Sequence, residues 1–512
     1  MNNVLRPIPD ERFAELPRRD LIVIARVEQR IRLQMQAEME RLEAYNKELQ
    51  ERTIEIEGKF VTIKNRLFGK SSEKQPKSDK KRKPGSGKPK KSDVTGRRPS
   101  ERYPNIPIIE KKLTLQDLPS CGTCGGSMQD SGMDEVSEYL SVVPKKYHIV
   151  RQMRRKYRCS CCHGNIQTTP GIPRIKPGSS YSDDMIIDIA LSKYCDLIPV
   201  ERYAAMAARQ GMPGLPPNSL IEMTHALADF LKPAVDRLLA EVQSLRVLQA
   251  DETPHRMLEG DKKSNWFLWG FCGPHAAYFE CHDTRSGTIA VAFLAQSQCE
   301  VLVSDVYSGY KKAVREANLA RIEEGRPQIE KAYCNAHARR KFKEAEHAYP
   351  VESDFYLGKY GEIYEIEANA KKNPEEALQL RQTMAIHFQA MKEEGSKHLQ
   401  EVSARSSLAN AIKYFTDYYE DLTRFWTDLA IPIDNNRQER TLRSPVVGRK
   451  TWYGTHSRRG AETAAKLFSL VESCKLNSVN PRQYFNDLVQ AIHNSDPPFT
   501  PKEYADRHQT VQ

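Results

Sequence analysis

The 512-residue sequence has no stretch that approaches the roughly 18 consecutive apolar residues of a membrane-spanning helix. Its amino terminus also lacks the basic segment followed by an apolar core that marks a secretory signal. Both absences argue against a membrane protein and against an exported one. We therefore expect a cytoplasmic protein with no membrane partner.

Acidic residues are scarce in one segment. Between Lys70 and Arg102, thirteen Lys or Arg residues stand against four Asp or Glu, whereas the rest of the chain is nearly balanced. Pro and Gly interrupt the same segment, so it cannot bury a core, and we predict a disordered basic linker over residues 70–104. Such a segment either acts as a solvated spacer or attracts nucleic-acid phosphates through counterion release.

Before this linker, apolar residues recur at steps of three and four, with one gap, from Ile24 to Leu67. This spacing predicts a long amphipathic helix within residues 1–69. Charged and amide residues fill the other positions, so only another helix can cover the apolar stripe. We expect a coiled coil between subunits, and hence a homo-oligomer; the alternative is a stripe that folds back on its own chain.

A disulfide framework is not expected, because the eleven cysteines are scattered through a large chain. Four of them form two C-x-x-C pairs with adjacent glycines: Cys121 and Cys124, then Cys159 and Cys162. Four thiolates can hold one Zn²⁺ tetrahedrally, and the glycines permit tight turns that direct backbone N–H groups at sulfur. We predict one structural zinc in a small domain over residues 105–172, with Cys161 or His163 as an alternative ligand in the second pair.

Residues 173–244 show helical patterns around a turn at Gly211. Three helices of this kind are typical of a helix-turn-helix, in which Asn218 and Ser219 would cap the recognition helix. A helical spacer explains the pattern equally well.

Three acids stand where predicted elements begin or end. Val301–Ser304 reads as a buried strand that ends at Asp305, and a shorter apolar run leads into Asp251. Glu439 falls in the first turns of a helix that follows the extended segment 431–435. Each acid also has a structural alternative, since Asp305 could cap a helix and Glu439 could close a capping box with Asn436.

Two further strands are expected at Trp266–Cys272 and Ala276–Cys281, as a hairpin that turns at Gly273 and Pro274. With the two acid-bearing strands they would make one sheet. Carboxylates from two strands and a distant helix can supply oxygen ligands for two divalent ions such as Mg²⁺.

The chain resembles the transposases of the insertion sequence 66 family. The resemblance rests on LQADETPHRML around Asp251, VLVSDVYSG around Asp305, CNAHARRKF from Cys334 and IPIDNNRQERTLRSPVVGRKTWYG from Ile431. It implies a multidomain α/β protein whose ribonuclease-H-like catalytic domain carries an Asp-Asp-Glu triad, here Asp251, Asp305 and Glu439, with two catalytic Mg²⁺ ions. It also implies an all-helical insertion in that domain.

From these patterns we expect the catalytic domain at residues 245–342 and 431–494, interrupted by the helical insertion at 343–430. Residues 495–512, rich in proline, are expected to form a tail.

Basic residues flank the predicted acids. Positive charge interleaved with Trp452 and Tyr453 suits a DNA backbone with distorted bases, although both rings could instead close the core. The candidates for DNA binding are His337, Arg340, Arg440, Arg443, Arg449 and Lys450. For His337 and Arg340 the alternative is a solvated basic helix face.

The sequence thus predicts a DNA transposase, nucleoid-associated, that acts on the terminal inverted repeats of a bacterial insertion sequence and on target DNA, with accessory proteins of the element as possible partners. The alternatives are a nuclease of the same fold without strand transfer, and a DNA-binding regulator derived from such an enzyme. The presence of all three acids argues against the regulator.

Overall fold

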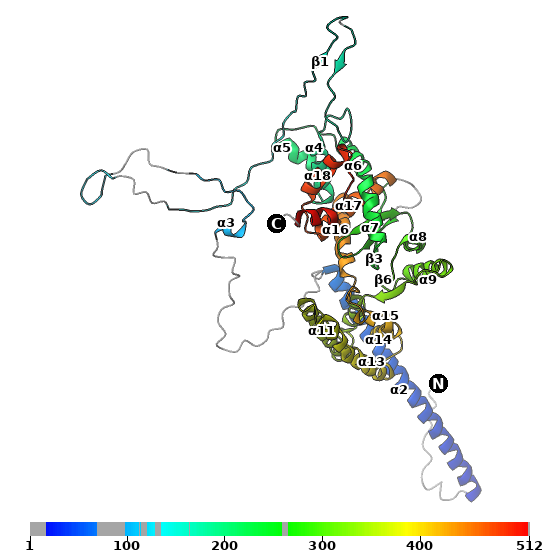
Figure 1. Ribbon diagram of the computed structural model, residues 1–512. Coiled ribbons are helices and arrows are strands. Elements are labelled where there is room, and N and C mark those ends of the chain that lie inside the picture. The colour runs from blue at the N-terminus through cyan, green and yellow to red at the C-terminus, as the bar shows by residue number, and fades with distance from the viewer. Residues whose placement is uncertain are drawn as a thin grey trace, which may run out of the picture. The chain divides into compact units, whose positions relative to one another are not determined.

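The computed structural model describes residues 17–68, 98–111, 113, 120–128, 135–162, 164–258 and 265–509 (Figure 1). The chain divides into two compact units, one of Met1–Lys70 with Met153–Gln512 and one of Ser71–Gln152. Within the described ranges, no helix is both long and apolar enough to cross a bilayer. Most of the basic linker and His163 lie outside these ranges.

A five-stranded mixed sheet forms the centre of the larger unit, in the order β5-β4-β3-β6-β7. The strands are β3 (Val247–Arg256), β4 (Asn265–Cys272), β5 (Ala277–His282), β6 (Val301–Ser304) and β7 (Glu330–Tyr333). β4 runs antiparallel to both β3 and β5, whereas β6 pairs in parallel with β3 and with β7. The predicted hairpin is confirmed, and Gly273 N–H donates to the carbonyl of Ala276 across its turn.

The first acid-bearing strand is longer than expected. β3 does not end at Asp251 but continues to Arg256, because its second half pairs with β4 after the parallel partner β6 has ended at Ser304. Asp251 is therefore held inside a strand yet lies just past the last paired residue of β6.

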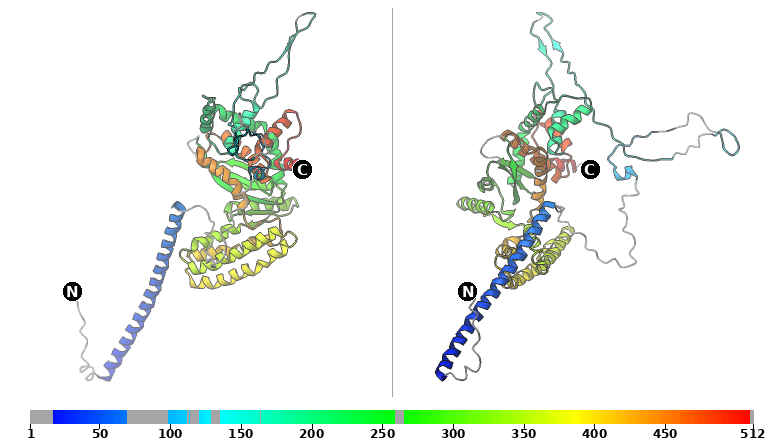
Figure 2. Two further views of the ribbon diagram at one scale, coloured as in Figure 1. Left: turned by 90° about the vertical axis from the view of Figure 1, so that its left-hand side faces the viewer. Right: turned by 180° about the vertical axis from the view of Figure 1, so that it is seen from behind.

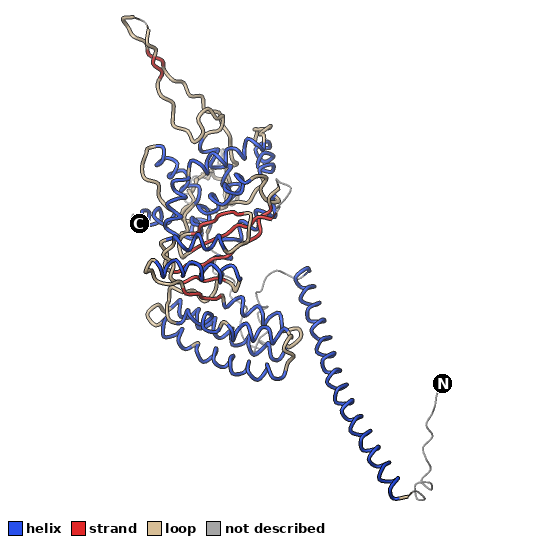
Figure 3. Tube along the Cα trace, turned by 90° about the vertical axis from the view of Figure 1, so that its right-hand side faces the viewer, coloured by secondary structure: helices blue, strands red, loops and turns tan. Residues whose placement is uncertain are grey.

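Helices cover both faces of the sheet (Figure 3). Leu302 joins a core that β3, β4 and β5 share with α4 (Asp183–Tyr194), α6 (Pro217–Phe230), α17 (Arg458–Leu476) and α18 (Pro481–His493). Val301 and Val303 face the opposite core, which is built mainly from the helices after β7. The continuous apolar run of β6 is thus explained by burial on both sides.

Residues 183–243 form four helices, where the sequence predicted three. The predicted three correspond to α4, α5 (Val200–Arg209) and α6, and the additional one is α7 (Lys232–Gln243). The predicted cap is wrong: α6 begins at Pro217 after an extended Pro216, so Asn218 and Ser219 already lie in its first turn. Because α4, α6 and α7 share one core with the sheet, this part of the chain has no separate hydrophobic core.

The segment between β7 and the carboxyl-terminal helices is helical throughout. It contains α10 (Asn335–Ala345), α11 (Pro350–Lys372), α12 (Ala377–Thr383), α13 (Ala385–Glu401), α14 (Ser407–Asp417), α15 (Tyr419–Thr423) and the short 3₁₀ turn Arg424–Trp426. α11, α13 and α14 form a bundle beside the sheet (Figure 2). Aromatic rings dominate its interior, among them Phe342, Tyr356, Phe388 and Phe415.

The predicted amino-terminal helix is α2 (Arg18–Phe68). It contacts the helical segment where Glu55 accepts from the backbone N–H of Ser407 at 2.6 Å. Its apolar stripe nevertheless remains exposed, with Ile56 and Phe60 each 67% accessible.

The carboxyl-terminal residues are not a tail. α19 (Pro501–Gln509) follows α18 and packs on it through Phe499 and Tyr504, both of which are buried. Tyr484 donates its hydroxyl to the carbonyl of Phe499 at 2.8 Å, and Tyr504 donates to Asp487 at 2.6 Å. Of the prolines that suggested a tail, Pro501 begins α19.

Phe499→Ala should lower the free energy of unfolding by about 3–5 kcal/mol, because it leaves a cavity between α18 and α19. Chemical denaturation measures this change, with Ile386→Ala on an exposed position of α13 as a control expected to stay within about 0.5 kcal/mol. Equal stability of the two variants would instead support the prediction of an unpacked tail.

Candidate active site

The pairing of β3 with β6 brings Asp251 beside Asp305. Val247 pairs with Val301 and Gln249 with Val303, so partners differ by a constant 54 in number. The same offset separates Asp251 from Asp305, which follows the last residue of β6. Both acids therefore lie at the same level on neighbouring strands.

The surroundings of Asp251 disfavour the ionised form of its carboxyl group. Burial raises the pKa of its carboxyl well above the usual range, and the negative charges of Glu252, Asp305 and Glu439 raise it further. A hydrogen bond from the backbone N–H of Glu252 to Asp251 Oδ1, at 2.9 Å, opposes this only in part. The three predicted acids are thus close enough to repel one another.

Asp305 does not cap a helix in the usual way. Its Oδ1 accepts the backbone N–H of Tyr307 at 3.0 Å, one residue before α9 (Ser308–Glu323) begins. The N-cap position itself is Tyr307, which makes no side-chain cap. The side chain therefore shapes the loop that leaves β6.

The helix that carries Glu439, α16 (Asn436–Trp452), is fastened to β3 at its first turn. Asn435 Nδ2 donates to the carbonyl of Ala250 at 2.9 Å, and Gln249 Nε2 donates to the carbonyl of Asp434 at 3.0 Å. Because these bonds involve the two residues that directly precede Asp251, they place the start of α16 beside the paired aspartates.

Glu439 does not form the capping box. Asp434 accepts the backbone N–H of Asn436 at 3.1 Å, so that donor is already satisfied. Among the described residues, the buried Oε1 of Glu439 has no hydrogen-bond partner; His337 Nδ1 lies 3.7 Å from it. The carboxylate is left available for a ligand.

Sequence reasoning missed a fourth acid, Glu252. Its side chain receives Arg285 in an ion pair at 2.6 Å and the hydroxyl of Tyr310 at 2.6 Å. Burial raises its pKa, while these two partners lower it. Because Glu252 follows Asp251 on β3, its side chain points to the face of the sheet opposite to that of Asp251. There its bond with Tyr310 connects β3 to α9.

The predicted DNA-binding residues fall on two helices. His337 and Arg340 are half-buried on α10, whereas α16 carries the exposed Arg440, Arg443 and Lys450 and the half-buried Arg449. Arg449 donates to Thr253 on β3 at 3.2 Å.

The two aromatic residues proposed to contact DNA, Trp452 and Tyr453, differ in their exposure. Trp452 packs against Phe468 in the core, with Lys193 Nζ 4.1 Å from its ring centroid. Tyr453 is 72% exposed and has a positive φ of 64°. It borders a cavity of about 230 Å³ that is also lined by His255 and Arg449.

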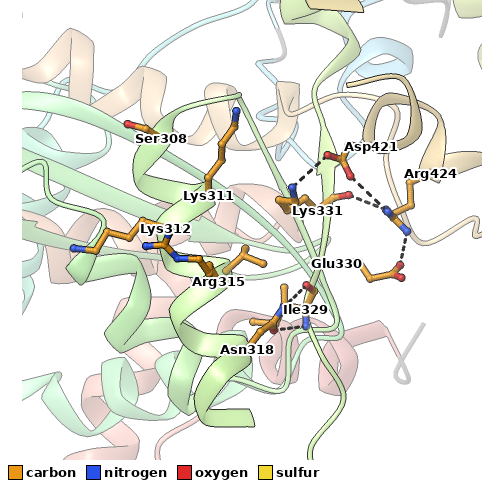
Figure 4. A pocket seen from close by; sticks show the side chains of 11 residues that line it. Ser308, Lys311, Lys312, Arg315, Asn318, Ile329, Glu330, Lys331, Asp421 and Arg424 are labelled. Carbon is orange, nitrogen blue, oxygen red and sulfur yellow. Dashed lines mark hydrogen bonds and ion pairs between the residues drawn. The ribbon is translucent and has the colours of Figure 1, made fainter. Parts of the chain in front are cut away.

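A larger cavity of about 520 Å³ lies beside α9, which follows directly after Asp305 (Figure 4). Lys311, Lys312 and Arg315 line one side of it on α9. On the other side, Lys331 pairs with Asp421 at 3.5 Å, and Arg424 pairs with Glu330 at 2.7 Å. Lys331 and Arg424 are each paired with an acid, whereas Lys312 and Arg315 share the single acid Glu316, so the excess positive charge belongs to α9.

Both cysteine pairs adopt the predicted tight turn. In the smaller unit, backbone N–H groups of Thr123 and Cys124 lower the pKa of Cys121 to about 7. In the larger unit, Cys159 receives the N–H groups of Cys161 and Cys162, which lower its pKa in the same way. The second turn lies at the end of a small hairpin of β1 (Lys156–Tyr157) and β2 (Gln167–Thr168).

Two family models match the chain. The one described as transposase of the IS66 family covers residues 178–463, and the one described as the zinc-finger binding domain of transposase IS66 covers residues 119–163. The first spans the five-stranded sheet and all three acids, and the second spans both cysteine pairs.

Similar proteins occur in Sinorhizobium fredii (strain NBRC 101917 / NGR234). The uncharacterized protein y4hP is 26% identical over 431 residues, which cover 79% of this chain and 76% of that protein. The uncharacterized protein y4jD is 28% identical over 424 residues, or 78% and 81% of the two chains.

Gly270→Ala tests the contact between the sheet and α16. A Cβ at Gly270, which pairs with Asp251, would lie 2.0 Å from Gln438 Nε2 and 2.8 Å from the ring of Phe279. We expect the unfolding free energy to fall by about 1–3 kcal/mol. Gly361→Ala, with open space around an exposed helical position, should instead gain up to about 1 kcal/mol. Two substitutions of the same sign would contradict the close contact.

Asp251→Asn should stabilise the protein at pH 8 without added divalent cations. The pKa of Asp251 is raised in the folded state, so its contribution to stability falls as pH rises from about 4, the unfolded value, through the folded value. Asn cannot ionise, so the variant does not lose this stability. The gain in melting temperature should vanish at about pH 3, where Asp251 is protonated in both the folded and the unfolded state. The exposed Asp354→Asn serves as control. A destabilised Asp251→Asn at pH 8 would show that the carboxylate is not under repulsion.

Proposed function

The chain belongs to the IS66 family of transposases, whose model matches residues 178–463, and from that premise we propose that it cuts and joins phosphodiester bonds at the ends of a bacterial insertion sequence. The observation that carries this proposal is the common register of Asp251 and Asp305 on β3 and β6. Hydrogen bonds from Asn435 to β3 and from Gln249 of β3 to Asp434 bring the start of α16, and with it Glu439, to the two aspartates. A cluster of this kind fits the Asp-Asp-Glu triad of a ribonuclease-H-like domain.

The three carboxylates fit divalent cations. Their mutual repulsion and the unpartnered Oε1 of Glu439 would both be relieved by a positive ion. Asp251, Asp305 and Glu439 would hold two Mg²⁺, which when bound supply activation of the attacking oxygen and stabilisation of the leaving oxygen. The protein's own part is to hold these oxygens in place while DNA is positioned.

Positioning of DNA is assigned to the basic residues around the acids. Arg440, Arg443 and Lys450 are exposed on the same helix as Glu439, so they can reach backbone phosphates near the cut. His337 and Arg340, on α10, would contact the DNA from a second helix. Tyr453 offers an exposed ring on which an unpaired base can stack.

The cavity beside α9 extends this DNA path. Lys312 and Arg315 face it within ten residues of Asp305, and among the described residues their ion-pair partner is Glu316, at 3.8 and 3.9 Å. These long, exposed pairs are weak, so phosphates would replace them readily.

The remaining parts fit supporting roles. The zinc-finger domain is proposed to hold one Zn²⁺ through Cys121, Cys124, Cys159 and Cys162. The exposed stripe of α2 is proposed to pair with a second subunit as a coiled coil. Residues 343–430, which include α11 to α15, are proposed to form the family's helical insertion.

Glu439→Gln should fold and bind DNA but abolish cleavage, because a neutral amide oxygen is a poor ligand for Mg²⁺. The assay incubates the full chain with DNA that flanks its own gene, in Mg²⁺ or Ca²⁺, and maps nicked and joined products. Glu323→Gln, an exposed acid on α9, is the matched control and should cleave normally.

The same assay separates the alternatives. Asp434→Asn should keep cleavage, since Asp434 accepts bonds from Asn436 and Tyr364 and only supports the start of α16. If Asp434→Asn is inactive while Glu439→Gln cleaves, the third acid is Asp434. Cleavage without joined products would favour a nuclease, and DNA binding that leaves every strand whole would favour a regulator.

Lys312→Ala combined with Arg315→Ala should weaken DNA binding at every sequence and reduce the slope of log K against log salt by about 1–2, because two phosphate contacts are lost. Lys371→Ala with Lys372→Ala, on the exposed end of α11, is the control pair. An unchanged slope in the α9 variant would place the DNA elsewhere.

A further inference from the structure

A second cluster of ligand-type atoms lies next to the three acids. Cys334 Sγ, a ring nitrogen of His337 and a carboxylate oxygen of Glu439 all lie within 4.8 Å of one another. Cys334 is the N-cap residue of α10 and His337 lies in the first turn of that helix, whereas Glu439 comes from α16. The cluster therefore joins two elements that are about 100 residues apart in sequence.

Two backbone amides are directed at the sulfur of Cys334, although burial raises the pKa of its thiol to about 12. The side chain is fully buried, and its Sγ accepts the backbone N–H of Asn435 at 3.2 Å. The backbone N–H of His337 is directed at the same sulfur. Two amides aimed at one cysteine sulfur repeat the arrangement seen in both C-x-x-C turns of this chain.

The other two members are left unsatisfied. His337 Nδ1 and Glu439 Oε1 are both buried, and within the described ranges neither has a hydrogen-bond partner. Their separation of 3.7 Å is too long for a hydrogen bond to each other. Each of these atoms is destabilising when it is buried without a partner. A cation between them would bind both at once.

The ligand types select the cation. One sulfur, one imidazole nitrogen and one carboxylate oxygen suit Zn²⁺, whereas Mg²⁺ prefers oxygen ligands only. Ligand atoms around a tetrahedral zinc lie about 3.3–3.8 Å apart, so a contraction of roughly 1 Å would complete the site. Three protein ligands leave the fourth position open.

We propose that Cys334, His337 and Glu439 form a binding site for Zn²⁺ or a similar thiophilic ion, separate from the two cysteine pairs. The site shares Glu439 with the carboxylate set assigned above. If that assignment holds, an ion bound through Glu439 Oε1 takes a ligand from the Asp251–Asp305 pair, and zinc should compete with Mg²⁺ for it.

The test counts zinc in the absence of DNA, so it does not depend on any cleavage activity. The full chain is purified under reducing conditions, equilibrated with Zn²⁺, dialysed and analysed for metal. The intact protein should hold about two zinc ions, one at the cysteine pairs and one at this site. Cys334→Ser and His337→Ala should each hold about one.

Two controls match these variants. Cys195→Ser removes a partly buried thiol at the end of α4, and His282→Ala removes a histidine on β5 that lies 3.3 Å from Glu280. Both should keep about two zinc ions. Asp251→Asn should keep them as well, which separates this site from the paired aspartates.

Replacement of zinc by Co²⁺ gives a second readout, because thiolate coordination produces a charge-transfer band. The difference between the spectra of intact protein and His337→Ala should contain such a band. One zinc per intact chain, or a second zinc that survives both Cys334→Ser and His337→Ala, would overturn the proposal.

Discussion

The register between β3 and β6 is the constraint on which the rest of the site depends. Val301 and Val303 are buried against the helical segment, and Leu302 is buried against the opposite core, so β6 has no free face. A slip of one residue would move each of these side chains to the wrong side. The burial that prevents the slip also fixes Asp305 beside Asp251, which no local interaction between the two acids would favour.

Placing three acids together costs stability, and the surrounding contacts offset that cost. The bonds from Asn435 and Gln249 hold α16 against β3, and Gly270 leaves the space that Gln438 of the same helix occupies. On the other face, Glu252 ties the strand to Arg285 and Tyr310. The fold therefore holds the carboxylates in place from both sides of β3, as expected for a site built to receive cations.

Much of the core was predictable from local patterns. The unbroken apolar run at Val301–Val303, the hairpin at Gly273 and the apolar repeat of α2 each point to one local structure. The spacing of Asp251 and Asp305 was visible too, but its meaning appears only when the pairing of β3 with β6 is known.

What could not be predicted depends on partners distant in sequence. β3 continues past Asp251 because β4 pairs with it. α19 is held in place because Phe499 and Tyr504 pack against Tyr484 of α18. Likewise, Trp452 is partly buried against Phe468 and Tyr194, while its neighbour Tyr453 is left exposed. The sequence identifies such residues as apolar or aromatic, but only tertiary packing decides which of them are covered.

The central claim is that Asp305, together with Asp251 and Glu439, binds a divalent cation at the reacting phosphate. Asp305→Cys tests it directly, because a thiolate is a poor ligand for Mg²⁺ and a better one for a softer ion such as Mn²⁺. Cleavage of DNA by this variant is measured in each metal and divided by that of the unaltered protein. The account predicts loss of cleavage in Mg²⁺ and recovery in Mn²⁺, whereas equal cleavage in both metals would contradict it.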